Sequence, residues 1–247
     1  MVLPSETELG RGSAGEFGRE VHSRELMEQS LKRRLLAEML ILGILTSIFL
    51  VVFPKRSIYI DGLLALLALS LILWNARFTR QSVWVQFPLR DNLRTRLRRS
   101  YTLAGIFTIP LILAFAGIGL AHGYRELGWE GAWDRVLNWH LPVIFLLYLP
   151  WALLQQFLFQ FYLLGRFLTL LPTPVAVFVT GITYSLVHLP EMGVALATAP
   201  AGIFWSFLYR RDRVLLPLGL SHALLGSTFY YWVYGRDLFL AWKDLVH

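Results

Sequence analysis

The sequence contains no cysteine and few charged residues. Without cysteine, the chain has no disulfide, no thiolate metal ligand and no cysteine nucleophile. Charged residues make up 16% of the 247 residues, whereas a soluble domain usually carries about 25%. Apolar residues make up 56% of the chain. This composition predicts a protein that lies in a lipid bilayer.

Long apolar runs are also missing at both ends of the sequence. Residues 1–30 include six glutamates and no apolar core, so we do not expect a secretory signal there. We predict a flexible cytoplasmic N-terminal tail over residues 1–31 and a short C-terminal tail over residues 235–247. The region between them, residues 32–234, is predicted to form a transmembrane bundle.

The apolar runs of this middle region predict an all-α, polytopic bundle of about seven membrane spans. A spanning helix needs about 20 mostly apolar residues to cross about 30 Å of hydrocarbon. The segments that meet this requirement are Leu35–Phe53, Ile58–Trp74, Tyr101–Ala121, Leu141–Leu164, Thr173–Leu189, Met192–Tyr209 and Val214–Tyr234. Proline interrupts hydrogen bonding in a helix, and Pro150 is a candidate break in the fourth span. Such a break would change the number of spans, so a total of six to eight spans fits the sequence.

Basic residues flank these spans mainly on one side. That side carries residues 32–34 before the first span and Arg210, Arg211 and Arg213 after the sixth. The positive-inside rule then predicts an integral protein of the plasma membrane, the inner membrane of a bacterium, with a cytoplasmic N-terminus. Because the net charge of +7 comes from residues beside apolar spans, we expect membrane lipid rather than nucleic acid as its partner.

Polar side chains occur inside three of the predicted spans. Gln155, Gln156 and Gln160 lie in the fourth span, His188 ends the fifth, and His222 lies near the middle of the last. A polar side chain in lipid is costly unless it has a partner or a use, so we predict that these residues meet in one cavity. Gln156 and Gln160 are four apart and could bond each other. Hydrogen bonding between helices, with no further role, is the structural alternative.

The depths of these residues in straight spans do not match. His188 falls near the outer end of its span, Gln155 near the middle and His222 in the inner half. Convergence therefore requires either a broken fourth helix or a shortened fifth helix.

In order and spacing, these residues resemble the CPBP family, which includes the type II CAAX prenyl endopeptidases and bacteriocin-processing or self-immunity proteins. The family pattern is Glu-Glu-x-x-x-Arg, then Phe-x-x-x-His, then His-x-x-x-Asn, each on a membrane helix. The resemblance covers residues 151–226 and places a CPBP-like core at about residues 141–234. Its most telling stretch is AGIFWSFLYRRDRVLLPLGLSHALLG.

The sequence also departs from this pattern. Both histidines are kept, whereas glutamines replace the two glutamates and the arginine, tyrosine replaces Phe, and glycine replaces Asn (Gln155, Gln156, Gln160, Tyr184 and Gly226). The resemblance implies that a glutamate activates water, while the histidines and the Asn position it and stabilise the oxyanion. A glutamine amide cannot take a proton near neutral pH, so a histidine would have to be the base here.

The resemblance therefore predicts a CAAX protease-like membrane endopeptidase with degenerate motifs, acting on a membrane-associated protein or a lipidated peptide. Its candidate catalytic residues are His188, His222, Gln155, Gln156 and Gln160. A catalytically inactive member that binds or scaffolds membrane proteins is the alternative, and a small transporter is the second. Hydrolysis and binding without hydrolysis are both consistent with these residues. Two histidines on separate helices are too few to predict a metal or haem, so we expect no cofactor.

Overall fold

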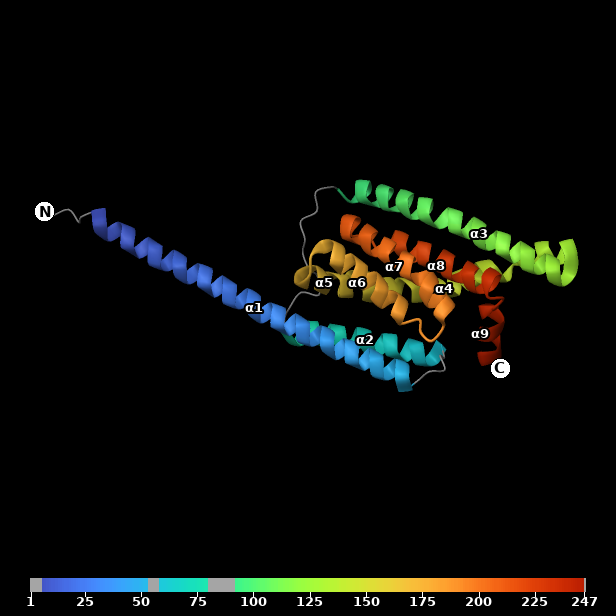
Figure 1. The fold of residues 1–247 in the computed structure, drawn as a ribbon, viewed down its shortest axis with the longest axis horizontal. Coiled ribbons are helices and arrows are strands. Elements are labelled where there is room, and N and C mark those ends of the chain that lie inside the picture. Colours follow the sequence, from blue (N-terminus) through green and yellow to red (C-terminus); the bar gives the residue numbers. More distant parts are fainter. Residues whose placement is uncertain (1–5, 53–57, 80–91, 247) are drawn as a thin grey trace.

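The structure is a computed structural model that describes residues 6–52, 58–79 and 92–246 (Figure 1). All regular structure in these ranges is helical, which confirms the predicted all-α fold. The α-helices are α1 (Glu6–Val52), α2 (Ile58–Thr79), α3 (Leu93–Val136), α4 (His140–Gln156), α5 (Leu164–Leu170), α6 (Thr173–Leu186), α7 (Met192–Asp212), α8 (Leu216–Thr228) and α9 (Leu238–Val246). Two π-helical segments, η1 (Phe157–Leu163) and η2 (Phe229–Val233), join α4 to α5 and extend α8.

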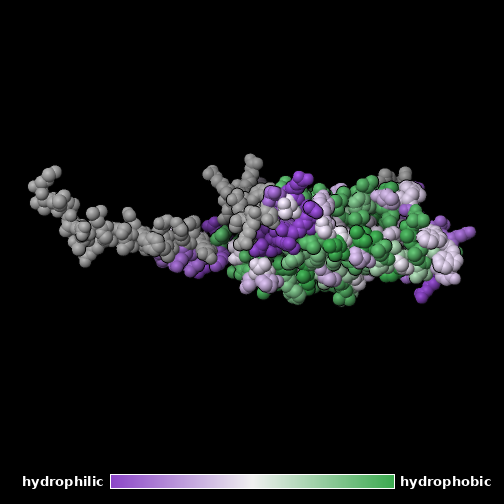
Figure 2. Space-filling model, turned by 90° about the horizontal axis from the view of Figure 1, so that it is seen from above, coloured by the Kyte–Doolittle hydropathy of each residue, from purple (hydrophilic) through white to green (hydrophobic). Residues whose placement is uncertain are grey.

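The bundle has the composition of a membrane protein. Among the described residues, three helices are long and apolar enough to span a bilayer: Leu93–Val136, which is kinked at Gly128, His140–Leu170 and Met192–Asp212. Shorter apolar helices cover Gly62–Trp74 and Thr173–Leu186. Figure 2 shows an apolar surface along the middle of the bundle, with more hydrophilic surface toward its ends. The predicted count of seven spans stays a prediction.

The predicted N-terminal tail and the first predicted span form one helix: α1 runs without interruption from Glu6 to Val52. The part before residue 32 is thus helical, and whether it is flexible stays a prediction. In Figure 1 the first half of α1 extends away from the other helices, whereas its second half runs beside α2. Residues 53–57 and 80–91 lie outside the described residues, including Phe53 at the end of the first predicted span.

The fourth predicted span is not broken at Pro150. The helix continues from His140 to Leu170, with Pro150 inside α4. Its hydrogen-bonding pattern changes from α to π further on, in η1, where the N–H of Leu164 donates to the carbonyl oxygen of Phe159, five residues back. One missing hydrogen bond at a proline leaves the flanking turns intact, so the interruption of the α-helical pattern comes from the π-turns instead.

The fifth span is shorter than predicted. Helix α6 ends at Leu186, and residues 187–190 form a turn that contains His188. Glycines hold α6 against α7: a Cβ at Gly181 would lie 2.5 Å from the backbone nitrogen of Ile203, and one at Gly202 would lie 2.9 Å from the carbonyl oxygen of Gly181. This contact requires glycine at both positions and fixes where the His188 turn sits.

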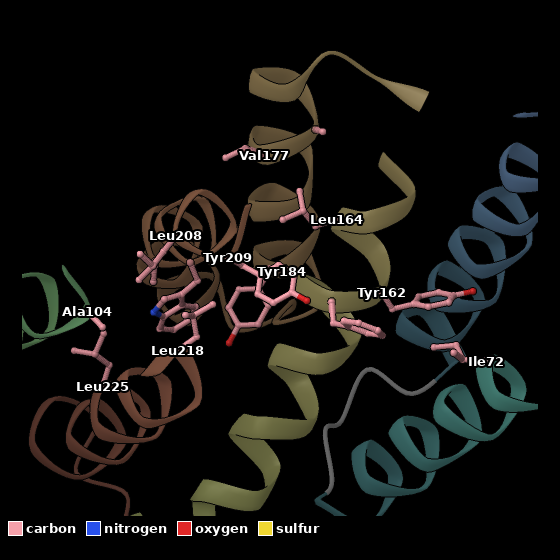
Figure 3. Packing of buried hydrophobic residues seen from close by; sticks show 14 residues of the cluster. Ile72, Ala104, Tyr162, Leu164, Val177, Tyr184, Leu208, Tyr209, Leu218 and Leu225 are labelled. Carbon is pink, nitrogen blue, oxygen red and sulfur yellow. The ribbon is translucent and has the colours of Figure 1, made fainter. Parts of the chain in front are cut away.

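The main core lies where η1, α5, α6, α7 and α8 meet (Figure 3). Trp205, Tyr184, Leu208 and Leu218 are its large buried side chains. Helix α8 packs on α4, where a Cβ at Gly219 would lie 2.3 Å from a methyl of Leu153. The core therefore sits directly against the helices that carry the predicted site residues.

The C-terminal segment closes one end of the bundle. Nδ1 of His140, at the start of α4, lies 2.5 Å from a carboxylate oxygen of Asp237. Arg236 donates to Glu191 at 2.8 Å, and this hydrogen bond raises the pKa of the Arg236 guanidinium. Residues 238–246, expected to be a tail, form α9, which contacts α4.

Candidate functional site

The candidate site is built around the pair Tyr184–His222. Tyr184 comes from α6 and is fully buried, and His222 comes from α8 with only 3% of its surface exposed. The Tyr184 hydroxyl lies 2.8 Å from Nε2 of His222, a normal hydrogen-bond distance. The two residues lie 38 positions apart in the chain, so only the packing of the helices brings them together: α8 packs on α4, and α6 packs on η1, which continues α4.

His188 also packs against the ring of Tyr184. Its ring centroid is 5.1 Å from that of Tyr184, and the His222 centroid is 5.7 Å from the same ring. Nδ1 of His188 lies 2.8 Å from the backbone carbonyl oxygen of Tyr184. A carbonyl oxygen only accepts, so Nδ1 carries the proton and Nε2 is the basic nitrogen of this half-buried ring. The two histidines, predicted from sequence, thus both pack against one tyrosine.

Gln155 and Gln156 approach the same pair from α4. Oε1 of Gln155 lies 3.5 Å from the Tyr184 hydroxyl, and Nε2 of Gln156 lies 3.5 Å from Nδ1 of His222. Both distances are at the limit for a hydrogen bond. The two amides therefore border the Tyr184–His222 pair without binding it tightly.

The amide–amide bond considered for Gln156 and Gln160 is not formed, and that expectation is wrong. Both side chains are 0% exposed. Among the described residues, neither amide atom of Gln160 has a hydrogen-bond partner, and Oε1 of Gln156 has none. The π-turns that begin at Phe157 change the rotation from one position to the next, so residues four apart no longer stack as in an α-helix. Within the part of the chain that the structure describes, no hydrogen bond joins the Gln160 amide to either histidine.

Tyr148 is a further site residue that the sequence reasoning missed. Its hydroxyl lies 3.3 Å from Nε2 of His222, and the two rings meet edge to face at 5.6 Å. Tyr148, Ala152 and Gln156 recur every four residues along α4, and this spacing could have pointed to Tyr148. A tyrosine by itself is a weak signal of a site, because phenols are common at the membrane interface.

Hydrogen bonds of Ser221, the residue before His222, hold α8 in place. The hydroxyl of Ser221 lies 2.6 Å from that of Thr108 in α3, and it accepts from the indole Nε1–H of Trp205 at 3.1 Å. The Trp205 ring also lies 4.9 Å from the His222 ring. Ser221 on α8 is thus bonded to α3 and to α7 beside the histidine.

The site offers neutral hydrogen-bonding groups. His222 contacts two phenols, one amide and a backbone group of Ala152, all of which are uncharged. Among the described residues, no group of three His, Asp or Glu side chains is placed to hold a metal ion. Such a site can bind the oxygen and N–H groups of a peptide, with an imidazole as its proton acceptor.

Comparisons with known proteins agree with the place of this site. Residues 137–228 match the family model described as type II CAAX prenyl endopeptidase Rce1-like. The matched segment runs from the connection before α4 to the end of α8, and so includes every predicted site residue. Neither a comparison with curated proteins nor one with solved structures gave a match.

Proposed function

Since the chain belongs to the CPBP family of membrane proteins, which includes the type II CAAX prenyl endopeptidases, we propose that it hydrolyses a peptide bond in a membrane-associated protein or peptide. The observation that carries this proposal is that His188 and His222 both pack against the ring of Tyr184. This arrangement supplies a basic nitrogen and a group of hydroxyl donors next to each other. Hydrolysis without a glutamate needs these two groups, a general base and donors that stabilise the oxyanion.

In the proposed reaction His188 replaces the missing glutamate as general base. Its Nε2 takes a proton from water, and the resulting hydroxide attacks the carbonyl carbon of the scissile bond. The negative charge that develops on the carbonyl oxygen is stabilised by phenolic O–H groups beside His222. The proton then passes from His188 to the leaving nitrogen as the C–N bond breaks, which gives a carboxylic acid and an amine.

A second candidate function is binding of a membrane peptide without cleavage. The buried glutamines favour it, because Gln156 and Gln160 are 0% exposed and retain amide atoms that no described residue bonds. Buried amides of this kind are costly unless a ligand or water satisfies them. No feature of the described residues favours the transporter alternative.

The deciding experiment uses the full chain in proteoliposomes with synthetic membrane-anchored peptides, farnesylated and unmodified, and mass spectrometry of the products. We expect wild type to cleave some of these peptides and His188→Ala to lower kcat by about 10²–10⁴-fold, the usual contribution of a general base. His22→Ala, in an exposed part of α1, is the control and should cleave like wild type. Cleavage that survives both His188→Ala and His222→Ala would discard the proposal.

Lack of cleavage by the wild type would favour binding, particularly if the variant Gln155→Glu/Gln156→Glu/Gln160→Arg cleaves. This variant leaves Gly226 unchanged, because a Cβ at that position would lie 2.5 Å from the Tyr148 ring. Binding of the same peptides to wild type would then be measured directly, by fluorescence of a labelled peptide.

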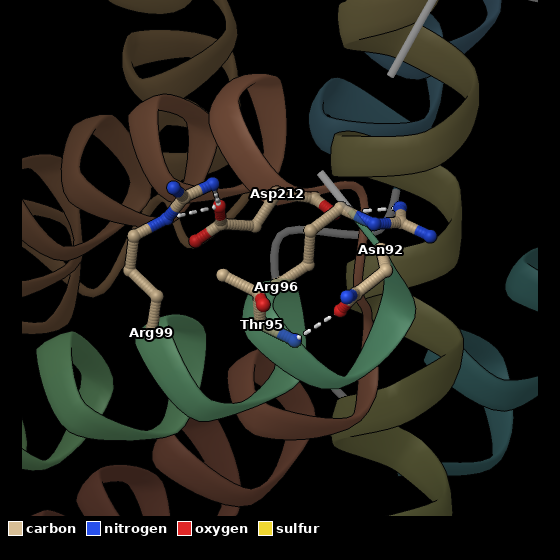
Figure 4. A network of polar contacts seen from close by, with 5 residues as sticks. All are labelled: Asn92, Thr95, Arg96, Arg99 and Asp212. Atoms are coloured by element: carbon tan, nitrogen blue, oxygen red, sulfur yellow. Dashed lines mark hydrogen bonds and ion pairs between the residues drawn. The ribbon is translucent and has the colours of Figure 1, made fainter. Parts of the chain in front are cut away.

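We also propose that the basic end of the bundle faces the cytoplasm and contacts anionic lipid. Arg96 and Arg99 at the start of α3 both contact Asp212 at the end of α7, so these two basic segments lie side by side (Figure 4). One buried aspartate cannot neutralise the arginines around it, and phosphate head groups would supply the balance. Binding of anionic vesicles that does not weaken with added salt would contradict this assignment.

A further inference from the structure

Two phenolic hydroxyls meet at one imidazole nitrogen. Tyr184 and Tyr148 lie 2.8 Å and 3.3 Å from the same atom, Nε2 of His222. They come from different helices, α6 and α4, and approach the ring nearly edge-on, with interplanar angles of 85° and 89°. A nitrogen of this kind has a single lone pair or a single hydrogen, directed outward in the plane of the ring.

This count leaves at least one of the two phenolic protons without an acceptor at Nε2. The Tyr184 hydroxyl also lies 3.5 Å from Oε1 of Gln155, at the limit for a hydrogen bond. If Nε2 has a lone pair, one hydroxyl donates to it; if Nε2 carries a hydrogen, neither hydroxyl does. Tyr184 is the closer by 0.5 Å and is fully buried, so it is the partner of His222. Among the described residues, the Tyr148 hydroxyl has no other hydrogen-bond partner than His222. Its proton is therefore available to an acceptor that is not part of the chain.

Gly226 provides the space that Tyr148 occupies. A Cβ at residue 226 would lie 2.5 Å from one ring carbon of Tyr148 and 3.1 Å from its hydroxyl oxygen. The first distance is shorter than real Cβ contacts and the second is tighter than most of them, so a side chain at 226 would displace the phenol. Because residue 226 lies one turn after His222 on α8, the Tyr148 ring fills the position where a side chain from α8 would otherwise stand beside the histidine.

We propose that Tyr148 is the residue that binds the substrate carbonyl, with its O–H donating to the carbonyl oxygen while Tyr184 holds His222. This assignment deepens the proposed function and rests on it for the identity of the ligand, a peptide carbonyl. Tyr148 keeps its place because Gly226 makes room for the ring. The hydrogen bond from Tyr148 strengthens as negative charge develops on the carbonyl oxygen, so it stabilises mainly the transition state.

The first test asks which phenol donates to His222 and needs no activity. Imidazole ¹⁵N spectra of the histidine-labelled full chain in detergent would be recorded for wild type, Tyr148→Phe and Tyr184→Phe, with His222→Ala to assign the signal. We expect Tyr184→Phe to shift the Nε2 resonance clearly and Tyr148→Phe to leave it almost in place. An equal or larger shift in Tyr148→Phe would overturn the assignment, because the Tyr148 proton would then belong to the histidine.

The second test measures cleavage of the peptides used for the proposed function. Tyr148→Phe keeps the ring and should lower kcat by about 10²-fold with little change in KM, as for loss of one oxyanion donor. Tyr101→Phe, an exposed tyrosine of α3, makes the same chemical change away from the site and should be neutral. A Tyr148→Phe variant with wild-type kcat would overturn the proposal.

A double-mutant cycle separates this role from general damage to the fold. Gly226→Ala should displace the phenol and lower kcat in the wild-type background, but cost little more when Tyr148 is already Phe. Additive losses would mean that residue 226 acts independently of the hydroxyl and would count against the proposal. If wild type cleaves no peptide, the proposed function fails, while the ¹⁵N spectra still decide the assignment of the two hydroxyls.

Discussion

The ion pair between Arg99 and Asp212 should be a measurable source of stability. Asp212 ends α7 with a side chain that is 0% exposed, and Arg99 lies near the start of α3 with 26% of its side chain exposed. Nε of Arg99 donates to Oδ1 at 2.7 Å, and Nη2 donates to the same oxygen (Figure 4). Arg96 donates to the backbone carbonyl oxygen of Asp212 at 3.1 Å, a bond that a side-chain substitution leaves in place.

The expected cost of Asp212→Ala follows from this geometry. A hydrogen bond to a charged group contributes about 1.5–3 kcal/mol, and removal of one partner from a fully buried ion pair costs about 3–5 kcal/mol. Here both bonds share one oxygen, and the arginine that remains is partly solvated, which lowers the penalty. We therefore expect a loss of about 2–3 kcal/mol in the free energy of unfolding.

The assay is reversible unfolding in mixed micelles with increasing dodecyl sulfate, followed by tryptophan fluorescence. Asp134→Ala is the matched control, because Asp134 is an exposed acid on α3 and should change stability by no more than about 0.5 kcal/mol. Arg99→Leu and the double variant complete a cycle, for which we expect a coupling of about 1–2 kcal/mol. If Asp212→Ala proves as stable as Asp134→Ala, the ion pair does not hold α3 to α7 as described here.

Two further substitutions test the packing that positions the histidines. Gly181→Ala should destabilise the bundle by about 1–3 kcal/mol, because its Cβ would lie 2.5 Å from the backbone of Ile203, whereas Gly117→Ala meets no atom within 4 Å and should be neutral or slightly stabilising in the same unfolding assay. Ser221→Ala should cost about 1–3 kcal/mol, because the indole N–H of Trp205 loses its acceptor in a buried place, and it should also broaden or shift the ¹⁵N signal of the neighbouring histidine.

Ser206→Ala is the control for the serine substitution. Ser206, on α7, is buried like Ser221, but its hydroxyl donates to the carbonyl oxygen of Gly202 within the same helix. An α-helix is stable without such a side-chain bond. Equal losses for Ser221→Ala and Ser206→Ala would show that the bond between helices adds nothing. A Gly181→Ala variant as stable as Gly117→Ala would show that α6 and α7 can separate at little cost.

The sequence alone determined the class of fold and the place of the site along the chain. Apolar runs of the length of a span have no other use than crossing lipid or filling a large core, so the positions of the helices followed from composition and length. The same holds for the candidate residues: a polar group inside an apolar run is costly wherever the run goes, so Gln155, Gln156, His188 and His222 could be singled out before any contact was known.

The tertiary structure decided which of these residues meet and how. Helix α6 ends early and η1 introduces π-turns, and neither change leaves a signature in the spacing of apolar residues. Tyr148 and Gly226 lie far apart in the chain, and their close contact depends on the distance between α4 and α8. Hydrogen-bond distances depend on how helices pack, and packing depends on the shapes of many side chains at once. The sequence therefore indicated a polar site, while only the fold placed two phenols at one imidazole nitrogen and a glycine against the ring of one of these phenols.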